Sequence, residues 1–269
     1  MLNVLHCKIT SPDNQKANLM TNSQVSHRIV LGLCTATVTT LSHLAVAPAQ
    51  AATLTHQYGL NNTLADSFGG SSLVANGGTL VASGGYSFAA NQGPSLSNAI
   101  DSSDYSIALD FSFSNVSGYR KIIDFKNLTS DNGLYTNNGN LGFYPIAEGS
   151  YTINPDTLAK VVLTRDGVTG QTTGYVNGAQ QFTFTDSGSI ATFDAASSII
   201  NFLQDDTVTS RGEASGGFLQ DISIYKGALS ASEVTGLSTA VPEPFTIIGT
   251  LIGGTAAIRM RKKLKASAN

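Results

Sequence analysis

Strict alternation in one segment constrains the fold more than any other feature of this chain. From Tyr105 to Phe113 (YSIALDFSF) every odd-numbered residue is apolar, whereas Ser106, Asp110 and Ser112 stand on the opposite face. Successive side chains of a strand point to opposite faces of its sheet, so this period of two predicts a half-buried antiparallel strand. The segment therefore indicates a sheet with one face packed on a core.

Strand and turn signals continue along the chain. Asn137–Asn140 and the pair Asn177-Gly178 are hairpin-turn sequences, because Asn and Gly adopt positive φ at least cost. Ser230 and Glu233 match a capping box and predict one short helix. Further strands are expected at Arg120–Phe125, Leu134–Thr136, Leu141–Tyr144, Lys160–Thr164, Thr173–Val176, Gln180–Phe184, Ile199–Leu203 and Phe218–Tyr225. Many short strands without alternating helices predict an all-β antiparallel sandwich.

Charge is unevenly distributed between this region and the C-terminus. Residues 52–240 contain 7 Lys and Arg against 16 Asp and Glu, a net charge of −9, whereas the whole chain carries −3. An acidic domain argues against nucleic acid as a partner, because phosphate binding needs a basic face. The two cysteines, Cys7 and Cys34, lie outside this region, so we expect no disulfide in it.

The N-terminus reads as a secretory signal peptide over residues 1–51. His27-Arg28 precedes the apolar run Ile29–Val38, and small residues around Ala49-Gln50-Ala51 form an A-x-A cleavage motif. The polar stretch before the apolar run is long for such a peptide, and a start at Met20 would give an ordinary length. A buried or transmembrane helix is the alternative, although the threonines and serine that follow Cys34 weigh against it.

The C-terminus has three parts in a fixed order. Val241-Pro242-Glu243-Pro244 comes first, then the 14 apolar or small residues Phe245–Ile258, then a basic cluster at Arg259–Lys265. The prolines disfavour helix through the motif, and the apolar stretch is short against the roughly 20 residues that span a bilayer. Positive charge stays in the cytoplasm, so everything before Val241 is expected on the far side of the membrane.

This three-part order at residues 241–265 resembles the PEP-CTERM sorting signal of bacteria that make exopolysaccharide. The resemblance implies an exosortase-type membrane protease as a partner, with Val241, Pro242, Glu243 and Pro244 as the sorting motif. It also implies a C-terminal transmembrane helix that anchors the chain at least transiently, before release to the cell surface or extracellular matrix. A plain C-terminal membrane anchor is the alternative, and both interpretations export the domain.

Residues 52–240 resemble a laminin-G-like, concanavalin A-like jelly roll. The resemblance rests on the order of four phrases and spans roughly residues 73–237, with an unrelated β-sandwich as the alternative. The phrases are Gly85–Phe88, Tyr105–Phe113, Leu163–Asp166 leading to Gly174–Gly178, and Ile222–Ser230.

Candidate catalytic residues are scarce. Glycosidases need two carboxyl groups that flank the scissile bond, but Glu148, Glu213 and Glu233 are the only glutamates of residues 52–240 and none has an acidic partner on the same strand face. Glu233 is explained as a helix cap. We therefore expect no enzyme activity, with a polysaccharide-active hydrolase as the alternative.

An acidic loop offers a possible calcium site. Asp205, Asp206 and Glu213 supply the oxygen ligands that Ca²⁺ prefers. Laminin-G and lectin folds often hold calcium on the rim of the sandwich, so the resemblance implies a calcium site in this loop. The alternative is an ordinary ion pair between Arg211 and Asp206 or Glu213.

Exposed aromatic side chains with nearby amides suit carbohydrate. Tyr119, Tyr135, Tyr144 and Asn138 are the candidate glycan contacts, and the alternative is that the tyrosines cover the edge of the core while the asparagines make turns. The sequence thus predicts an exported, non-catalytic surface or matrix protein that binds an extracellular polysaccharide or another partner. A structural matrix protein without a specific ligand is the remaining alternative.

Overall fold

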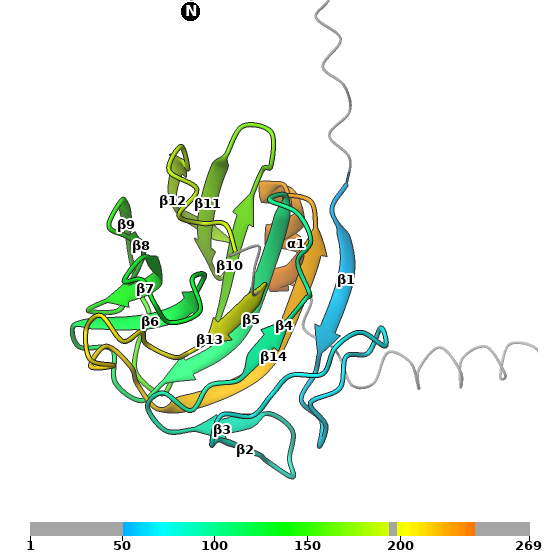
Figure 1. Ribbon diagram of the computed structural model, residues 1–269, viewed down its shortest axis with the longest axis vertical. Coiled ribbons are helices and arrows are strands. Elements are labelled where there is room, and N and C mark those ends of the chain that lie inside the picture. The colour runs from blue at the N-terminus through cyan, green and yellow to red at the C-terminus, as the bar shows by residue number, and fades with distance from the viewer. Residues whose placement is uncertain (1–50, 194–197, 240–269) are drawn as a thin grey trace, which may run out of the picture. The chain divides into compact units, whose positions relative to one another are not determined.

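Eight antiparallel strands form the larger of two sheets in the computed structural model, which describes residues 51–193 and 198–239 (Figure 1). Its strands are β1 (Thr53–Tyr58), β2 (Thr79–Leu80), β3 (Tyr86–Phe88), β5 (Tyr105–Phe113), β10 (Ala159–Arg165), β11 (Gln171–Val176), β12 (Ala179–Thr185) and β14 (Gly217–Lys226). They run in the order β12-β11-β10-β5-β14-β3-β2, and β1 pairs with the second half of β14.

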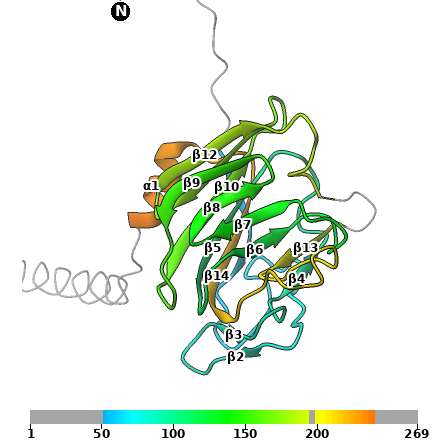
Figure 2. The same cartoon turned by 90° about the vertical axis from the view of Figure 1, so that its left-hand side faces the viewer.

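Six antiparallel strands form the smaller sheet, which faces the viewer in Figure 2. They are β4 (Ser95–Ser97), β6 (Tyr119–Asp124), β7 (Gly133–Asn137), β8 (Asn140–Tyr144), β9 (Ala147–Thr152) and β13 (Ile199–Phe202). Their order is β4-β13-β6-β7-β8-β9, so strands distant in sequence are neighbours. The prediction of an all-β antiparallel sandwich is confirmed.

The core lies between the inner faces of the two sheets. Phe111 and Phe113 of β5 meet edge to face, with ring centroids 4.9 Å apart. Phe143 of β8 packs on Phe125, with centroids 5.5 Å apart. All four side chains are fully buried, and burial of each stabilises the fold by about 1.5–3 kcal/mol.

The outer face of β5 is also covered, which corrects the expectation of a half-buried strand. Ala108 of β5 packs against Leu229 and Val234, at the start of the helix α1 (Ala231–Thr239). Ser106 is fully buried, and its hydroxyl is satisfied there: it donates to Gly227 O at 2.9 Å and accepts from Leu229 N at 2.8 Å. The Ser106 hydroxyl, which suggests a solvent-facing side, is thus satisfied by hydrogen bonds to the chain that leads into α1.

Local turn and cap chemistry is confirmed. Asn138 and Gly139 join β7 to β8 with φ angles of 49° and 86°, and Asn177 and Gly178 join β11 to β12 with 50° and 83°. These are the two-residue hairpin turns that fix strand register. At α1, the backbone N–H of Ser230 donates to a Glu233 carboxylate oxygen at 2.7 Å, as a capping box requires.

Both predicted export segments lie outside the described residues. They include Ala49, Gln50 and the motif Val241–Pro244, whereas Ala51 is described and exposed. Within residues 51–193 and 198–239, no helix has the length and apolarity needed to cross a membrane.

Candidate functional site

One row of residues crosses four strands of the smaller sheet. Lys121 on β6 is the register partner of Tyr135 on β7, Tyr135 pairs with Gly142 on β8, and Gly142 pairs with Glu148 on β9. Their neighbours Leu134, Leu141 and Phe143 belong to the core, so alternation directs the row to the outer face. Gly142 has no side chain, so the row is hollow between Tyr135 and Glu148.

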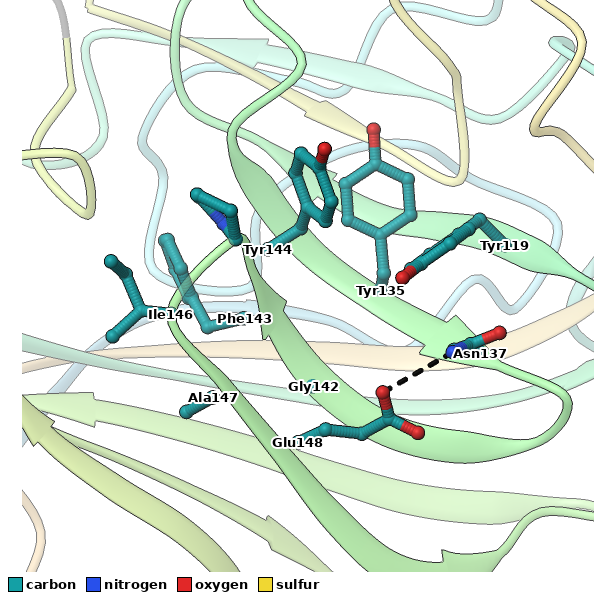
Figure 3. A pocket seen from close by; sticks show the side chains of 10 residues that line it. Tyr119, Tyr135, Asn137, Gly142, Phe143, Tyr144, Ile146, Ala147 and Glu148 are labelled. Atoms are coloured by element: carbon teal, nitrogen blue, oxygen red, sulfur yellow. Dashed lines mark hydrogen bonds between the residues drawn. The ribbon is translucent and has the colours of Figure 1, made fainter.

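That hollow is a pocket with a volume of about 190 Å³ (Figure 3). It is smaller than the roughly 300–1,000 Å³ typical of small-molecule sites, so it fits one ring or the end of a longer ligand. The lining residues are Tyr119, Tyr135, Asn137, Gly142, Phe143, Tyr144, Pro145, Ile146, Ala147 and Glu148.

Three tyrosines form one wall of the pocket. Tyr119 meets Tyr135 and Tyr144 edge to face, with ring centroids 5.9 Å and 5.6 Å apart, and Tyr135 meets Tyr144 at 6.1 Å. Such mutually tilted rings hold one another in place. Tyr135 is almost fully buried, whereas Tyr119 and Tyr144 are partly exposed. The wall therefore offers a ligand aromatic surface chiefly from Tyr119 and Tyr144.

Glu148 and Asn137 form the polar side of the pocket. Asn137 Nδ2 donates to Glu148 Oε2 at 3.2 Å, the contact drawn as a dashed line in Figure 3. Asn140 Nδ2 lies 3.5 Å from the other carboxylate oxygen. Glu148 is exposed, so its carboxylate is oriented by these amides and still free to accept a hydrogen bond from a ligand.

A buried ion network supports the tyrosine wall. Lys121 is fully buried, and its Nζ donates to Ser130 O at 3.0 Å, to Asp124 at 3.4 Å and to Asp206 in the closest contact of the three. The same ammonium lies 5.0 Å from the centroid of the Tyr135 ring. A buried ammonium is tolerated only with such complete pairing.

Asp206 reaches this network from a loop that leaves the smaller sheet and returns to it. Leu203 N donates to Ile122 O at 2.8 Å, and Lys121 N donates to Glu213 O at 2.9 Å, so both ends of the loop rest on β6. Within the loop, Asp206 accepts from Val208 N at 2.7 Å and from Thr209 N at 3.2 Å. The loop thereby carries its acidic residues back to the edge of the pocket.

The carboxylates of this region shift the pKa values of their neighbours. Burial opposes ionisation of Asp206, but the hydrogen bond and charge of Lys121 outweigh it and lower its pKa. Burial, then repulsion from Asp131, Asp205 and Asp206, raises the pKa of Glu213. Burial and then Glu148 raise the pKa of Tyr119. Negative charge from neighbouring carboxylates therefore adds to the effect of burial at Glu213 and Tyr119.

The structure brings three of the four predicted glycan contacts together. Tyr119, Tyr135 and Tyr144 share the pocket, whereas Asn138 lies outside its lining, and its Oδ1 accepts from Gly118 N at 3.0 Å to brace the turn. The predicted glycan contacts did not include Asn137 or Glu148. Asn137 stands two residues after Tyr135 in a strand, so period two would have placed it on the same face.

The predicted calcium ligands do not fit a metal site. Asp206 is paired with Lys121 rather than Arg211, and Asp205 accepts from Thr209 Oγ1 and Glu213 N, both at 2.8 Å. Asp205 Oδ1 is buried and has no hydrogen-bond partner among the described residues. These residues nonetheless contain no cluster of three or more His, Cys, Asp or Glu side chains arranged to hold a metal ion. The Lys121 ammonium supplies the positive charge that the loop needs.

Comparison with known proteins identifies the family of this chain. Residues 84–235 match the family described as the concanavalin A-like lectin/glucanases superfamily. The chain belongs to this superfamily. A sequence comparison with curated proteins finds no match.

Solved structures share the fold of this superfamily member at low identity. Domain 4 of AbnA, an extracellular arabinanase of Geobacillus stearothermophilus in complex with arabinotriose, is 22% identical with a TM-score of 0.57, over 71% of this chain and 100% of that one. A Trypanosoma rangeli sialidase is 14% identical with a TM-score of 0.54, over 71% of this chain and 33% of that one. The binding domain of Paraclostridial Mosquitocidal Protein 1 is 18% identical with a TM-score of 0.53, over 70% and 52%.

Proposed function

We propose that this chain is an exported, non-catalytic glycan-binding protein of the cell surface or extracellular matrix. The pocket on the outer face of the smaller sheet carries the proposal. Its tyrosine wall suits the C–H face of a sugar ring, while Asn137 and Glu148 suit the hydroxyl groups at the ring edge. The arabinotriose complex of AbnA domain 4, which shares the fold, supports the same ligand class.

The non-catalytic part of the proposal follows from the chemistry of glycoside hydrolysis. Two carboxyl groups must flank the scissile bond, one as acid and the other as base or nucleophile. Of the residues that line the pocket, Glu148 alone carries a carboxylate. A single oriented carboxylate binds hydroxyl groups but does not complete this pair.

Glycan arrays test the binding function. The purified protein is expected to bind extracellular polysaccharides, and Tyr119→Ala is expected to weaken binding by about tenfold, as for an aromatic contact residue. Tyr151→Ala is the matched control, because Tyr151 is an exposed tyrosine of β9 outside the pocket. Absence of binding to every polysaccharide, or equal losses in the two variants, contradicts the proposal.

A polysaccharide hydrolase is the second candidate. Burial, and then repulsion from Asp131, Asp205 and Asp206, raises the pKa of Glu213, and a raised pKa is what the general acid of a glycosidase needs. Release of reducing ends by the purified protein, abolished in Glu213→Gln, would establish this activity and displace the non-catalytic proposal.

Export and sorting are the part of the proposal that rests on sequence alone. The signal peptide of residues 1–51 and the tripartite tail of residues 241–265 support secretion and handling by an exosortase-type protease. Mass spectrometry of both ends of the protein from fractionated cells tests it. Cleavage after Ala51 and processing near Pro242-Glu243-Pro244 are expected, and an intact cytoplasmic chain would refute export.

A further inference from the structure

We propose that the pocket selects glycans with free amino groups, which are positively charged, over neutral and acidic glycans. This inference rests on the proposed glycan-binding function and specifies the class of sugar. The pocket combines a wall of three tyrosines with one oriented carboxylate, and its lining contains no lysine or arginine.

Glu148 is the first element of this selectivity. Its two carboxylate oxygens accept from Asn137 at 3.2 Å and from Asn140 at 3.5 Å, so the group is held in place while it faces solvent. A carboxylate binds an ammonium group with a charge-assisted hydrogen bond, about twice as strong as a neutral one. An uronate or sialate carboxylate would instead meet Glu148 with like charge, which excludes it.

The tyrosine wall favours the same charge. The face of an aromatic ring is electron-rich and attracts a cation within about 6 Å of its centroid. Tyr135 already receives the Lys121 ammonium at 5.0 Å, which shows the electrostatic preference of this site. Tyr119 and Tyr144 are more exposed, and their ring surfaces are available to a ligand.

The surroundings add negative potential. Asp131 accepts from the Tyr135 hydroxyl at 3.0 Å. Glu213 ends the acidic loop, and its backbone oxygen accepts from Lys121 N on β6 at 2.9 Å. Burial is the largest cause of the raised pKa of Tyr119, and the charges of Glu148, Glu213 and Asp131 raise it further. A cationic sugar entering the pocket is therefore attracted by several carboxylates rather than one.

The nearby cations do not cancel this field. Lys121 is fully buried and already paired with Asp206 and Asp124. Arg120 directs Nη1 to the carbonyl oxygens of Tyr119 at 2.9 Å and Gly212 at 3.5 Å. The loop also carries the exposed Arg211, and Lys126 follows Asp124 along the chain. Four positive groups thus stand among the six carboxylates of Asp124, Asp131, Glu148, Asp205, Asp206 and Glu213, and the balance stays negative.

Binding of three matched oligosaccharides tests the inference. Calorimetry on the full chain compares glucosamine oligomers, their fully N-acetylated forms and uronic acid oligomers of the same length. We expect the glucosamine oligomers to bind about tenfold more tightly than the N-acetylated ones, and uronic acid oligomers not at all. The preference should shrink as salt rises, because the pocket is open to solvent and its charges are screened.

Two variants assign the preference to the pocket. Glu148→Gln keeps a side chain that can bond Asn137 but removes the charge, so the preference should fall to about twofold. Asp101→Asn is the control, because it removes the same charge from an exposed residue outside the pocket. Asp101 lies 3.9 Å from Lys226, the last residue of β14 in the larger sheet, and the variant should leave the preference intact.

The outcomes separate the two proposals. Equal affinity for the N-acetylated and free amine oligomers, or a preference that survives high salt, overturns the selectivity while glycan binding stands. A preference unchanged in Glu148→Gln moves the selectivity away from this pocket and overturns the inference as well. Failure to bind any of the three oligomers, or any other glycan, overturns both proposals.

Discussion

The Lys121 ammonium lies 5.0 Å from the centroid of the Tyr135 ring, and the two residues are register partners on β6 and β7. Tyr135 in turn donates its hydroxyl to Asp131 at 3.0 Å and lies 3.3 Å from Asp206. The aromatic wall of the pocket and the buried ion network are therefore one unit, so a change in the network alters the ligand site.

Lys121→Met should destabilise the protein by about 3–5 kcal/mol, because it leaves Asp206 and Asp124 as uncompensated buried charges. Urea unfolding measures the loss. Lys160→Met is the matched control: Lys160 pairs with Asp110 at 2.5 Å, but both side chains are about a fifth exposed (23% and 19%). Loss of that pair should cost less than loss of the fully buried one, and equal losses would show that Lys121 is not desolvated.

Asp221→Asn should raise the free energy of unfolding at neutral pH. Burial, and then repulsion by Asp110 among smaller effects, raises the pKa of Asp221, and Asp110 is its register partner on β5. A carboxyl group whose pKa is higher in the folded state destabilises that state when ionised. The gain should shrink as the pH falls to the unfolded value of about 3.9, as urea unfolding at several pH values would show.

Asp206→Asn should change the free energy of unfolding in the opposite direction. Its folded-state pKa is lowered, so ionised Asp206 stabilises the fold above the unfolded pKa, and that contribution is lost as the pH falls through the folded value. The variant should be less stable than the parent at neutral pH, and the deficit should close in acid. The same pH trend for both variants would contradict the two assignments.

Gly142→Ala should weaken glycan binding by about fivefold, because a methyl group enters the floor of the pocket. The added Cβ would lie 2.8 Å from Ala147 O, so β9 must also shift. Titration with the best ligand of the array checks this. Gly188→Ala is the control, since its Cβ would meet only Ile190 at an ordinary 3.7 Å, and it should leave binding unchanged.

Gly236→Ala should stabilise the protein by about 0.5–1 kcal/mol, since glycine within a helix costs that much relative to alanine. A Cβ at this position of α1 meets no atom within 4 Å. The same change at Gly178, where φ is +83°, should instead destabilise by about 1 kcal/mol. Thermal melts of both variants give the comparison, and a loss at Gly236 would contradict it.

Local chemistry made much of the fold predictable. The Asn-Gly turns, the alternation of β5 and the capping box of Ser230 and Glu233 each depend on residues close in sequence. Five strands were not predicted. β2, β3 and β4 are only two or three residues long. β1 and β9 were missed because TLTHQY and AEGSYT lack a clear apolar face and become strands only through pairing with β14 and β8.

The site was predictable only in part, because its charges come from distant residues. The tyrosines suggested a binding face, and the structure brings three of them together. A lysine is normally expected at the surface, yet Lys121 is buried because it pairs with Asp206, which is 85 positions away in the sequence. The acidic loop suggested calcium for the same reason: its neutralising cation is a lysine on another strand.

The placement of α1 has a consequence for how the protein meets its surroundings. α1 covers the outer face of the larger sheet, whereas the pocket opens on the outer face of the smaller sheet, so the two lie on opposite sides of the sandwich. The chain leaves the described region at Thr239, at the end of α1. If the C-terminal tail anchors the chain as proposed, the helix that leads to the tail leaves the pocket uncovered, because α1 packs on the other sheet.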